Sequence, residues 1–207
     1  FTASGSITVA EANTLSGLIS HGSRSLTATI SNGDMATLAG ISESGHNLSI
    51  TITDTSVAAA ALNTLDGKTA STINASNITT LTGAAADLNT AYASSGISGL
   101  NNEAVTLSDT SLSASVLNTL DNNTSGTINA SNITTLTGSA ADLNTAYASS
   151  GISGLGNEAV TLSDTTLAVS VLNTLDGNTS GAINASNITT LTGSAADLNT
   201  AYASSGI

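Results

Sequence analysis

The chain repeats itself with a 55-residue period, and this period limits what it can fold into. Residues 97–151 and 152–206 differ at only six positions, each an exchange between small or polar side chains. Each copy in such an array forms one supersecondary unit, and neighbouring units bury their apolar faces against each other. We therefore expect a stack of equivalent units, not a globule around a single core.

Each period divides into two unequal parts, marked by the recurring triplet Leu-Asn-Thr. The triplets follow each other in alternating 26- and 29-residue steps, and they begin at Leu62, Leu88, Leu117, Leu143, Leu172 and Leu198. Worn copies of the pattern occur near Ala12 and Met35. The sequence thus predicts about eight coils of 23–29 residues, with divergent coils over 1–52 and a regular array over 53–207.

The pattern inside each coil predicts a strand followed by a short helix. Ala104–Asp109 alternates apolar and polar residues, which is typical of a strand. Apolar residues then recur at helical spacing, with Asp109 as the expected N-cap. Ser139 is the equivalent cap of the other coil, and Thr127–Ala130 is a candidate for a further short strand. A strand–helix–strand order gives parallel pairing. We expect an α/β solenoid, a parallel β-sheet backed by short helices, with a parallel β-helix as the runner-up.

Composition excludes several classes of function. The net charge is −12, and Arg24 and Lys68 are the only basic residues. Proteins that bind nucleic acids or anionic membranes need clustered Lys and Arg, so both partners are excluded. No apolar run approaches the ~18 residues of a membrane span. The absence of Cys excludes disulfides and thiolate metal sites. Because the chain begins at Phe1 and ends inside its own period, we expect it to be a processed or excerpted part of a longer array, or one that docks onto another subunit.

Asparagine, aspartate and threonine recur at fixed positions and are the candidates for sites. We expect the Asn of the triplets to form a structural ladder of stacked side chains, which would satisfy buried polar groups. The ladder comprises Asn63, Asn89, Asn118, Asn144, Asn173 and Asn199.

The acidic columns are the only candidates for a metal site. They comprise Asp54, Asp109, Asp164, Asp66, Asp121 and Asp176. Calcium needs several oxygen ligands at one point, and neither the EF-hand loop nor the glycine-rich nonapeptide of calcium-binding β-rolls is present. We interpret these residues as helix caps and solvated surface, so no cofactor is predicted and calcium is the alternative.

Thr-x-Thr and Thr-x-Ser pairs recur in the predicted strands and would form an exposed surface ladder. The pairs are Thr51 and Thr53, Thr80 and Thr82, Thr106 and Ser108, Thr135 and Thr137, Thr161 and Ser163, and Thr190 and Thr192. Ice-binding solenoids present arrays of this kind, although Thr is also a common solvent-facing strand residue. The ladder could serve ice binding, adhesion to an unidentified surface or glycan, or packing against another copy.

An enzymatic function is not predicted. The only histidines, His21 and His46, lie in the irregular N-terminal part, and no Ser is distinguished as a nucleophile with a base beside it. Nearly identical repeats would also each have to hold the same active site.

The segment TLSDTSLSASVLNTLDNNTSGTINASNITTLTGSAADLNTAYASSGISGL resembles the tandem repeats of giant secreted surface proteins of marine picocyanobacteria. It is similar to repeats of the swimming-motility-associated surface protein of marine Synechococcus, over Thr53 to Ile207. The resemblance implies export, an extracellular or cell-surface location and a structural role, and it transfers no catalytic residue. Similar arrays occur in adhesins and phage fibres. We therefore expect a non-enzymatic structural module of a rod or filament that contacts flanking repeats or copies of itself, with an adhesin or ice-binding solenoid and a phage or secretion-system fibre as alternatives.

Overall fold

A computed structural model describes residues 1–19 and 24–207, which form eight helices and sixteen short strands. The strands pair in parallel, so the predicted α/β class with parallel sheets and alternating strand–helix units is confirmed. The helices contain 4–11 residues, and the runner-up, a β-helix without helices, is therefore wrong. The chain divides into two compact units, Phe1–Ala104 and Val105–Ile207, and the boundary predicted at residue 52 falls inside the first.

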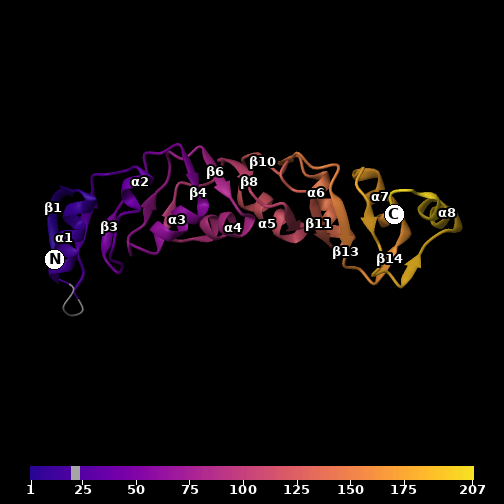
Figure 1. Cartoon of the computed structure of the whole chain (residues 1–207), viewed down its shortest axis with the longest axis horizontal. Helices are drawn as coiled ribbons and strands as arrows, with labels where there is room; N and C mark the ends of the chain where they lie inside the picture. Colours follow the sequence, from indigo (N-terminus) through magenta and orange to yellow (C-terminus); the bar gives the residue numbers. More distant parts are fainter. Residues whose placement is uncertain (20–23) are drawn as a thin grey trace. The chain divides into compact units, whose positions relative to one another are not determined.

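The N-terminal unit begins with three parallel strands in sequential order and two helices. These elements are β1 (Thr2–Ile7), α1 (Val9–Ile19), β2 (Thr27–Ile30), α2 (Met35–Leu38) and β3 (Asn47–Ser49). Its second half contains two strand pairs, β4 with β6 and β5 with β7, and two helices that pack on each other (Figure 1). Their bounds are β4 (Ser56–Ala58), α3 (Ala59–Asp66), β5 (Ile73–Asn74), β6 (Thr80–Gly83), α4 (Ala85–Ala93) and β7 (Ile97–Ser98).

The C-terminal unit continues the same alternation of strands and helices. Its strands are β8 (Ala104–Leu107, which starts at the last residue of the N-terminal unit), β9 (Ser111–Ser113), β10 (Ile128–Asn129), β11 (Thr135–Gly138), β12 (Ile152–Ser153), β13 (Ala159–Leu162), β14 (Thr166–Ala168), β15 (Ile183–Asn184) and β16 (Thr190–Thr192). Its helices are α5 (Ala114–Asn123), α6 (Ala140–Ala148), α7 (Val169–Asn178) and α8 (Ala195–Ala203), and each packs on the next.

The short and long steps of the sequence correspond to repeats with two and three strands. We call 124–149 and 179–204 short repeats, each with two strands before its helix, and 150–178 a long repeat, with three. By the same division 69–94 is a short repeat and 95–123 a long one.

The extra strand of the long repeat shifts how its neighbours stack. In 150–178 the first strand, β12, pairs with β10 of the preceding repeat, and the last, β14, pairs with β16 of the following repeat. The middle strand, β13, pairs on both sides, with β11 and with β15. Partners in these pairings, such as Leu136 with Val160, lie less than half a period apart in the sequence. Residues equivalent in sequence therefore do not all stack on each other.

Small aliphatic side chains form the core of each unit, as the composition predicts. The leucine of each internal triplet is at most 1% exposed, and so are strand residues such as Leu81 and Leu136. Alanine at the first turn of the helices is equally buried, at Ala85, Ala114 and Ala140. Side chains this small fill the narrow space between a helix and the strands before it.

Two local predictions are settled by the structure. The predicted strand at Thr127–Ala130 is confirmed as β10. Ile133, which shares a face with Thr135 if the strand is regular, lies before β11 in a turn, where its N–H donates to Ala130 O at 2.9 Å. The turn reorients Ile133 into the core, where it is 3% exposed. In the part of the chain that the structure describes, no helix is both long and apolar enough to span a bilayer.

Candidate functional site: the contacts between repeats

A half-buried tyrosine and a buried glutamate join a short repeat to the long repeat after it. Tyr147, near the end of α6, donates its hydroxyl to Glu158 Oε2 at 3.0 Å. Glu158 is 0% exposed, and its two carboxylate oxygens also accept from the backbone N–H of Gly156 at 3.2 and 2.8 Å. The C-terminal unit contains no Lys, Arg or His, so hydrogen bonds alone stabilise this carboxylate.

The same pair recurs in the N-terminal unit, one full period earlier in the sequence. Tyr92 donates to Glu103 Oε2 at 3.1 Å, and the backbone N–H of Asn101 donates to both carboxylate oxygens at 3.0 Å. Glu103 is 2% exposed. The contact is thus a regular feature of the repeat.

The environment of Tyr147 favours its neutral form. Burial raises the pKa of its phenol well above the ordinary value, a hydrogen bond with Thr179 acts in the opposite direction, and the charge and hydrogen bond of Glu158 raise it further. The raised pKa keeps the proton on the phenol, where it is needed as the donor to Glu158.

A second polar contact joins each long repeat to the short repeat after it. Asp121 Oδ2 accepts from the hydroxyl of Ser149 at 2.7 Å, and the same hydroxyl accepts the backbone N–H of Gly151 at 3.0 Å. Asp176 with Ser204 (2.8 Å) and Asp66 with Ser94 (2.6 Å) repeat the contact. Gly151 lies so close to the Asp121 carboxylate that a Cβ there would require the carboxylate to move.

Another aspartate caps the helix of the preceding repeat, and this corrects the prediction for Asp109. Asp164 Oδ2 accepts from the backbone N–H of Ala140, the first residue of α6, at 2.8 Å. Asp54 does the same for Met35 of α2 at 2.7 Å. Asp109 lies in the turn between β8 and β9, and α5 has Ser113 as its N-cap, with no side-chain cap bond. The prediction failed because the strand after each Asp separates it from its own helix.

The predicted N-cap at Ser139 is confirmed. Its hydroxyl accepts the backbone N–H of Asp142 at 3.1 Å and donates to the Asp142 carboxylate at 2.8 Å. Together, Ser139 and Asp164 satisfy two of the N–H groups that a helix start leaves unpaired, one from the same repeat and one from the next.

The candidate metal ligands do not come together. Residues 1–19 and 24–207 contain no group of three or more His, Asp or Glu side chains that could hold a metal ion. Each of Asp54, Asp164, Asp66, Asp121 and Asp176 instead accepts from a backbone N–H or a serine hydroxyl. Successive members of one acidic column are also 55 residues apart, which is more than the length of one repeat, so they do not lie in adjacent repeats.

Four asparagines of the triplets donate to the backbone of the neighbouring helix and not to another asparagine of the column, which corrects the predicted ladder. Asn63 and Asn118 each donate from Nδ2 to a backbone carbonyl in the first turn of the next helix, Asp87 O and Asp142 O, at 2.9 Å. Asn173 makes the same bond to Asp197 O at 3.1 Å, and Asn144 donates to Val171 O at 3.2 Å. The amide N–H groups therefore bond to the neighbouring helix backbone instead of to a second amide of the column.

A further asparagine column, for which no structural role was predicted, links strand turns. Asn77, Asn132 and Asn187 donate from Nδ2 to Ile52 O, Leu107 O and Leu162 O at 2.7–2.8 Å. Donor and acceptor are 25 positions apart in each case, so the bond joins two successive turns of the chain. The recurrence of Asn132 once per period was the available signal.

The predicted threonine ladder faces outward, since none of its twelve residues is buried, but part of it lies outside the strands. Ser108 and Ser163 are exposed and follow the last residues of β8 and β13, so their assignment to strands is wrong. Thr53 likewise lies outside the strands. Asn132 and Asn187 bond to the carbonyl just before each serine, where the chain turns. The prediction failed because the alternation of apolar and polar residues continues past the last paired residue.

The strand register also breaks the ladder into short pieces. In the C-terminal unit, Thr137 pairs with Thr161, whose next partner is Asn184. Thr190 pairs instead with Thr166, because the extra strand β14 takes that place. The residues therefore form short mixed columns, and an ice-binding function, which needs a regular array, is not favoured.

His46 has a structural role in the N-terminal unit. It is buried and accepts the backbone N–H of Leu26 at its Nδ1 atom, at 3.3 Å. His21 lies outside the described residues. The tyrosine–glutamate pairs could have been predicted from the sequence, because Glu103 and Glu158 follow Tyr92 and Tyr147 at the same spacing of 11 residues.

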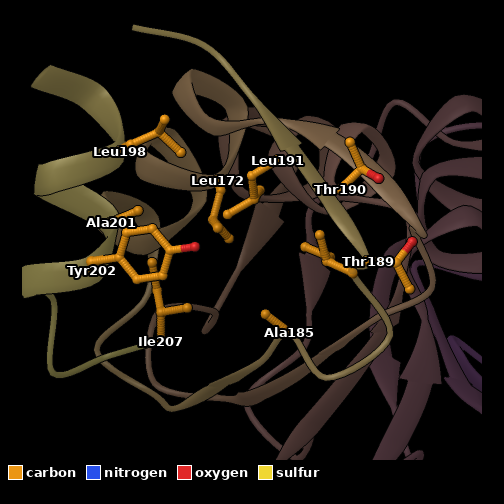
Figure 2. Close-up of a pocket in the computed structure, with 10 residues that line it drawn as sticks. Leu172, Ala185, Thr189, Thr190, Leu191, Leu198, Ala201, Tyr202 and Ile207 are labelled. Carbon is orange, nitrogen blue, oxygen red and sulfur yellow. The ribbon is translucent and has the colours of Figure 1, made fainter. Parts of the chain in front are cut away.

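A hollow of ≈ 420 Å³ opens on the C-terminal face of the second unit. Figure 2 shows Leu172, Leu191, Leu198, Tyr202 and Ile207 around it. Its lining is aliphatic apart from Tyr202 and two threonines, so it offers apolar surface and no cluster of catalytic groups.

The fold and these contacts define an α/β protein built from repeated strand–helix units, in which polar side chains connect one repeat to the next. Comparison with known protein families, curated proteins and solved structures finds no match to the chain.

Proposed function

We propose that the chain is a non-enzymatic structural module, an α/β solenoid that forms part of a rod or filament. The observation that carries this proposal is the recurrence of the same partly buried polar contacts at 55-residue intervals. Tyr147 with Glu158 and Ser149 with Asp121 occupy the positions of Tyr92 with Glu103 and Ser94 with Asp66. In these contacts the Tyr, Glu, Ser and Asp side chains form hydrogen bonds between neighbouring repeats.

The module would lengthen by adding repeats, because each repeat buries the apolar face of its neighbour. The regular repeats are nearly identical in sequence, so an active site in one of them would have to recur in the others, which favours a structural role. The module would need no cofactor, and its unfolding in urea should be the same with calcium as with a chelator.

The resemblance of the sequence supports a location outside the cell or at its surface, with flanking repeats or further copies as partners. A net charge of −12 favours solubility and opposes lateral aggregation of such modules. Adhesion and a fibre of a phage or secretion system are specific uses of the same architecture.

The experiment that tests the proposal is to lengthen the chain by one, two and three copies of residues 153–207. Small-angle X-ray scattering of each purified chain gives its maximum dimension. A solenoid gains the same length with every copy, whereas a compact globule grows roughly as the 0.38 power of its residue number. Equal increments support the proposal, and increments that shrink towards the globular law would refute it.

A further inference from the structure

Successive repeats meet through two chemically different faces. A long repeat presents an aspartate to the serine of the short repeat that follows, as Asp121 does to Ser149. A short repeat presents a tyrosine to the glutamate of the long repeat that follows, as Tyr147 does to Glu158. In the regular array, tyrosine occurs only in short repeats and glutamate only in long ones. The tyrosine of a short repeat therefore finds its glutamate partner only in a long repeat, and the aspartate of a long repeat finds its serine partner in a short repeat.

The C-terminal face of the chain has the same sequence as a face that is covered inside the C-terminal unit. Residues 190–203 are identical to 135–148. In the internal copy, which the long repeat 150–178 covers, Leu136 and Leu143 are 0% exposed. In the C-terminal copy the equivalent leucines are partly exposed, and Tyr202 is 80% exposed beside the hollow of Figure 2.

The covering long repeat shows which contacts this face makes. In this repeat Glu158 accepts from Tyr147, and Asp164 accepts from the Ala140 N–H. Val171 O accepts from the Asn144 amide, and β13 pairs with β11 over four residues. The equivalent donors on the C-terminal face are Ala195, Asn199 and Tyr202, and all three residues are exposed.

We propose that the C-terminal face is a docking surface for a long repeat, a 29-residue segment with acidic residues at the positions of Glu158 and Asp164, and that it discriminates against a short repeat. The inference rests on the proposed function and names the partner of one face. A short repeat in that place would bring no carboxylate to Tyr202. A buried phenol without an acceptor costs free energy, so the wrong neighbour is penalised as well as the right one favoured.

Chains with different extensions test the discrimination. One chain receives a copy of residues 153–178 after Ile207, which completes a long repeat. A second receives a copy of 129–149, so that Ile207 takes the place of Ile128 and the appended segment supplies the rest of the strands and the helix of a short repeat. Hydrogen exchange followed by mass spectrometry measures protection of each appended segment, with residues 105–189 as the internal control for folding.

We expect amides of the long extension to exchange at least about 100-fold more slowly than unfolded chain, and those of the short extension to exchange at nearly the unfolded rate. Replacing Tyr202 with Phe in the long-extended chain should remove at least about ten-fold of this protection. Glu158→Gln in the appended copy alone should reduce protection by less, because the amide oxygen still accepts from the phenol.

Equal protection of the two extensions, or an unchanged value after Tyr202→Phe, would overturn the docking inference. Either result would leave lengthwise growth intact, because scattering tests that separately. Sedimentation of the unextended chain at high concentration addresses a competing occupant. Head-to-tail association that Tyr202→Phe weakens would assign the face to a second copy instead, and would also overturn the inference.

Discussion

Replacing Tyr147 with Phe tests the chemistry of the contact between repeats directly. The ring stays, so apolar burial is kept, and only the hydroxyl that donates to Glu158 at 3.0 Å is lost. Glu158 is 0% exposed and would keep one backbone donor, the N–H of Gly156. A hydrogen bond to a charged group contributes about 1.5–3 kcal/mol, so we expect the free energy of unfolding to fall by about 2–3 kcal/mol.

Urea unfolding followed by circular dichroism at neutral pH measures this change, with Tyr202→Phe as the matched control. The control removes the same atom from a side chain that is 80% exposed, so its effect should stay within about 0.5 kcal/mol. If Tyr147→Phe costs no more than Tyr202→Phe, the phenol does not stabilise the buried carboxylate and the reasoning is refuted.

A double-mutant cycle that combines Tyr147→Phe with Glu158→Gln separates the contribution of the Glu158 charge from that of the hydrogen bond itself. The amide oxygen of Gln accepts the same hydrogen bond without a charge, so Tyr147→Phe in this background should cost only about 1 kcal/mol. If Tyr147→Phe costs as much in the Glu158→Gln background as in the original chain, the hydroxyl stabilises something other than the carboxylate. In the N-terminal unit, Tyr92→Phe should lower the free energy of unfolding by the same amount as Tyr147→Phe in the original chain.

Three further predictions concern caps, pH and glycines. Ser139→Ala should lower the free energy of unfolding by about 1 kcal/mol, and Ala84→Ser, which restores the missing cap of α4, should raise it by a similar amount in urea titrations. The pKa of Tyr147 is raised in the folded state, so its contribution to stability is complete below the pKa of the unfolded state, about 10. This contribution is lost as the pH rises from about 10 towards the higher pKa of the folded state. Urea unfolding midpoints that stay constant above about pH 10 would contradict this prediction. Gly154→Ala should destabilise the fold by at least about 1–2 kcal/mol, because the φ of Gly154 is +86° and a Cβ would lie 2.8 Å from Ser131 N. Gly177→Ala in α7, with open space around the new Cβ, should be neutral or stabilising by up to about 1 kcal/mol. Thermal melts of the two variants distinguish these outcomes.

The sequence by itself determined the repeat, the class of fold and much of the local structure. The 55-residue period, the alternation that begins at Ala104 and the helical spacing that follows are local patterns, and strand and helix formation respond to such patterns directly. The cap at Ser139 was predictable for the same reason, since it bonds to a group three residues away in the chain. The end of a strand was less predictable, as Ser108 shows, because it depends on where the partner strand stops pairing.

Only the tertiary structure decided which residues of different repeats meet. The spacing of sequence repeats suggested that Thr161 would stack on Thr190, but the third strand of the long repeat places Asn184 beside Thr161. The sequence likewise assigned Asp109 to its own helix, although the equivalent Asp164 caps the helix before it. Contacts between repeats depend on how far the chain advances between one strand and the strand that it pairs with. That advance is less than half of the sequence period and is set by strand pairing and helix packing together, so the period alone does not reveal it.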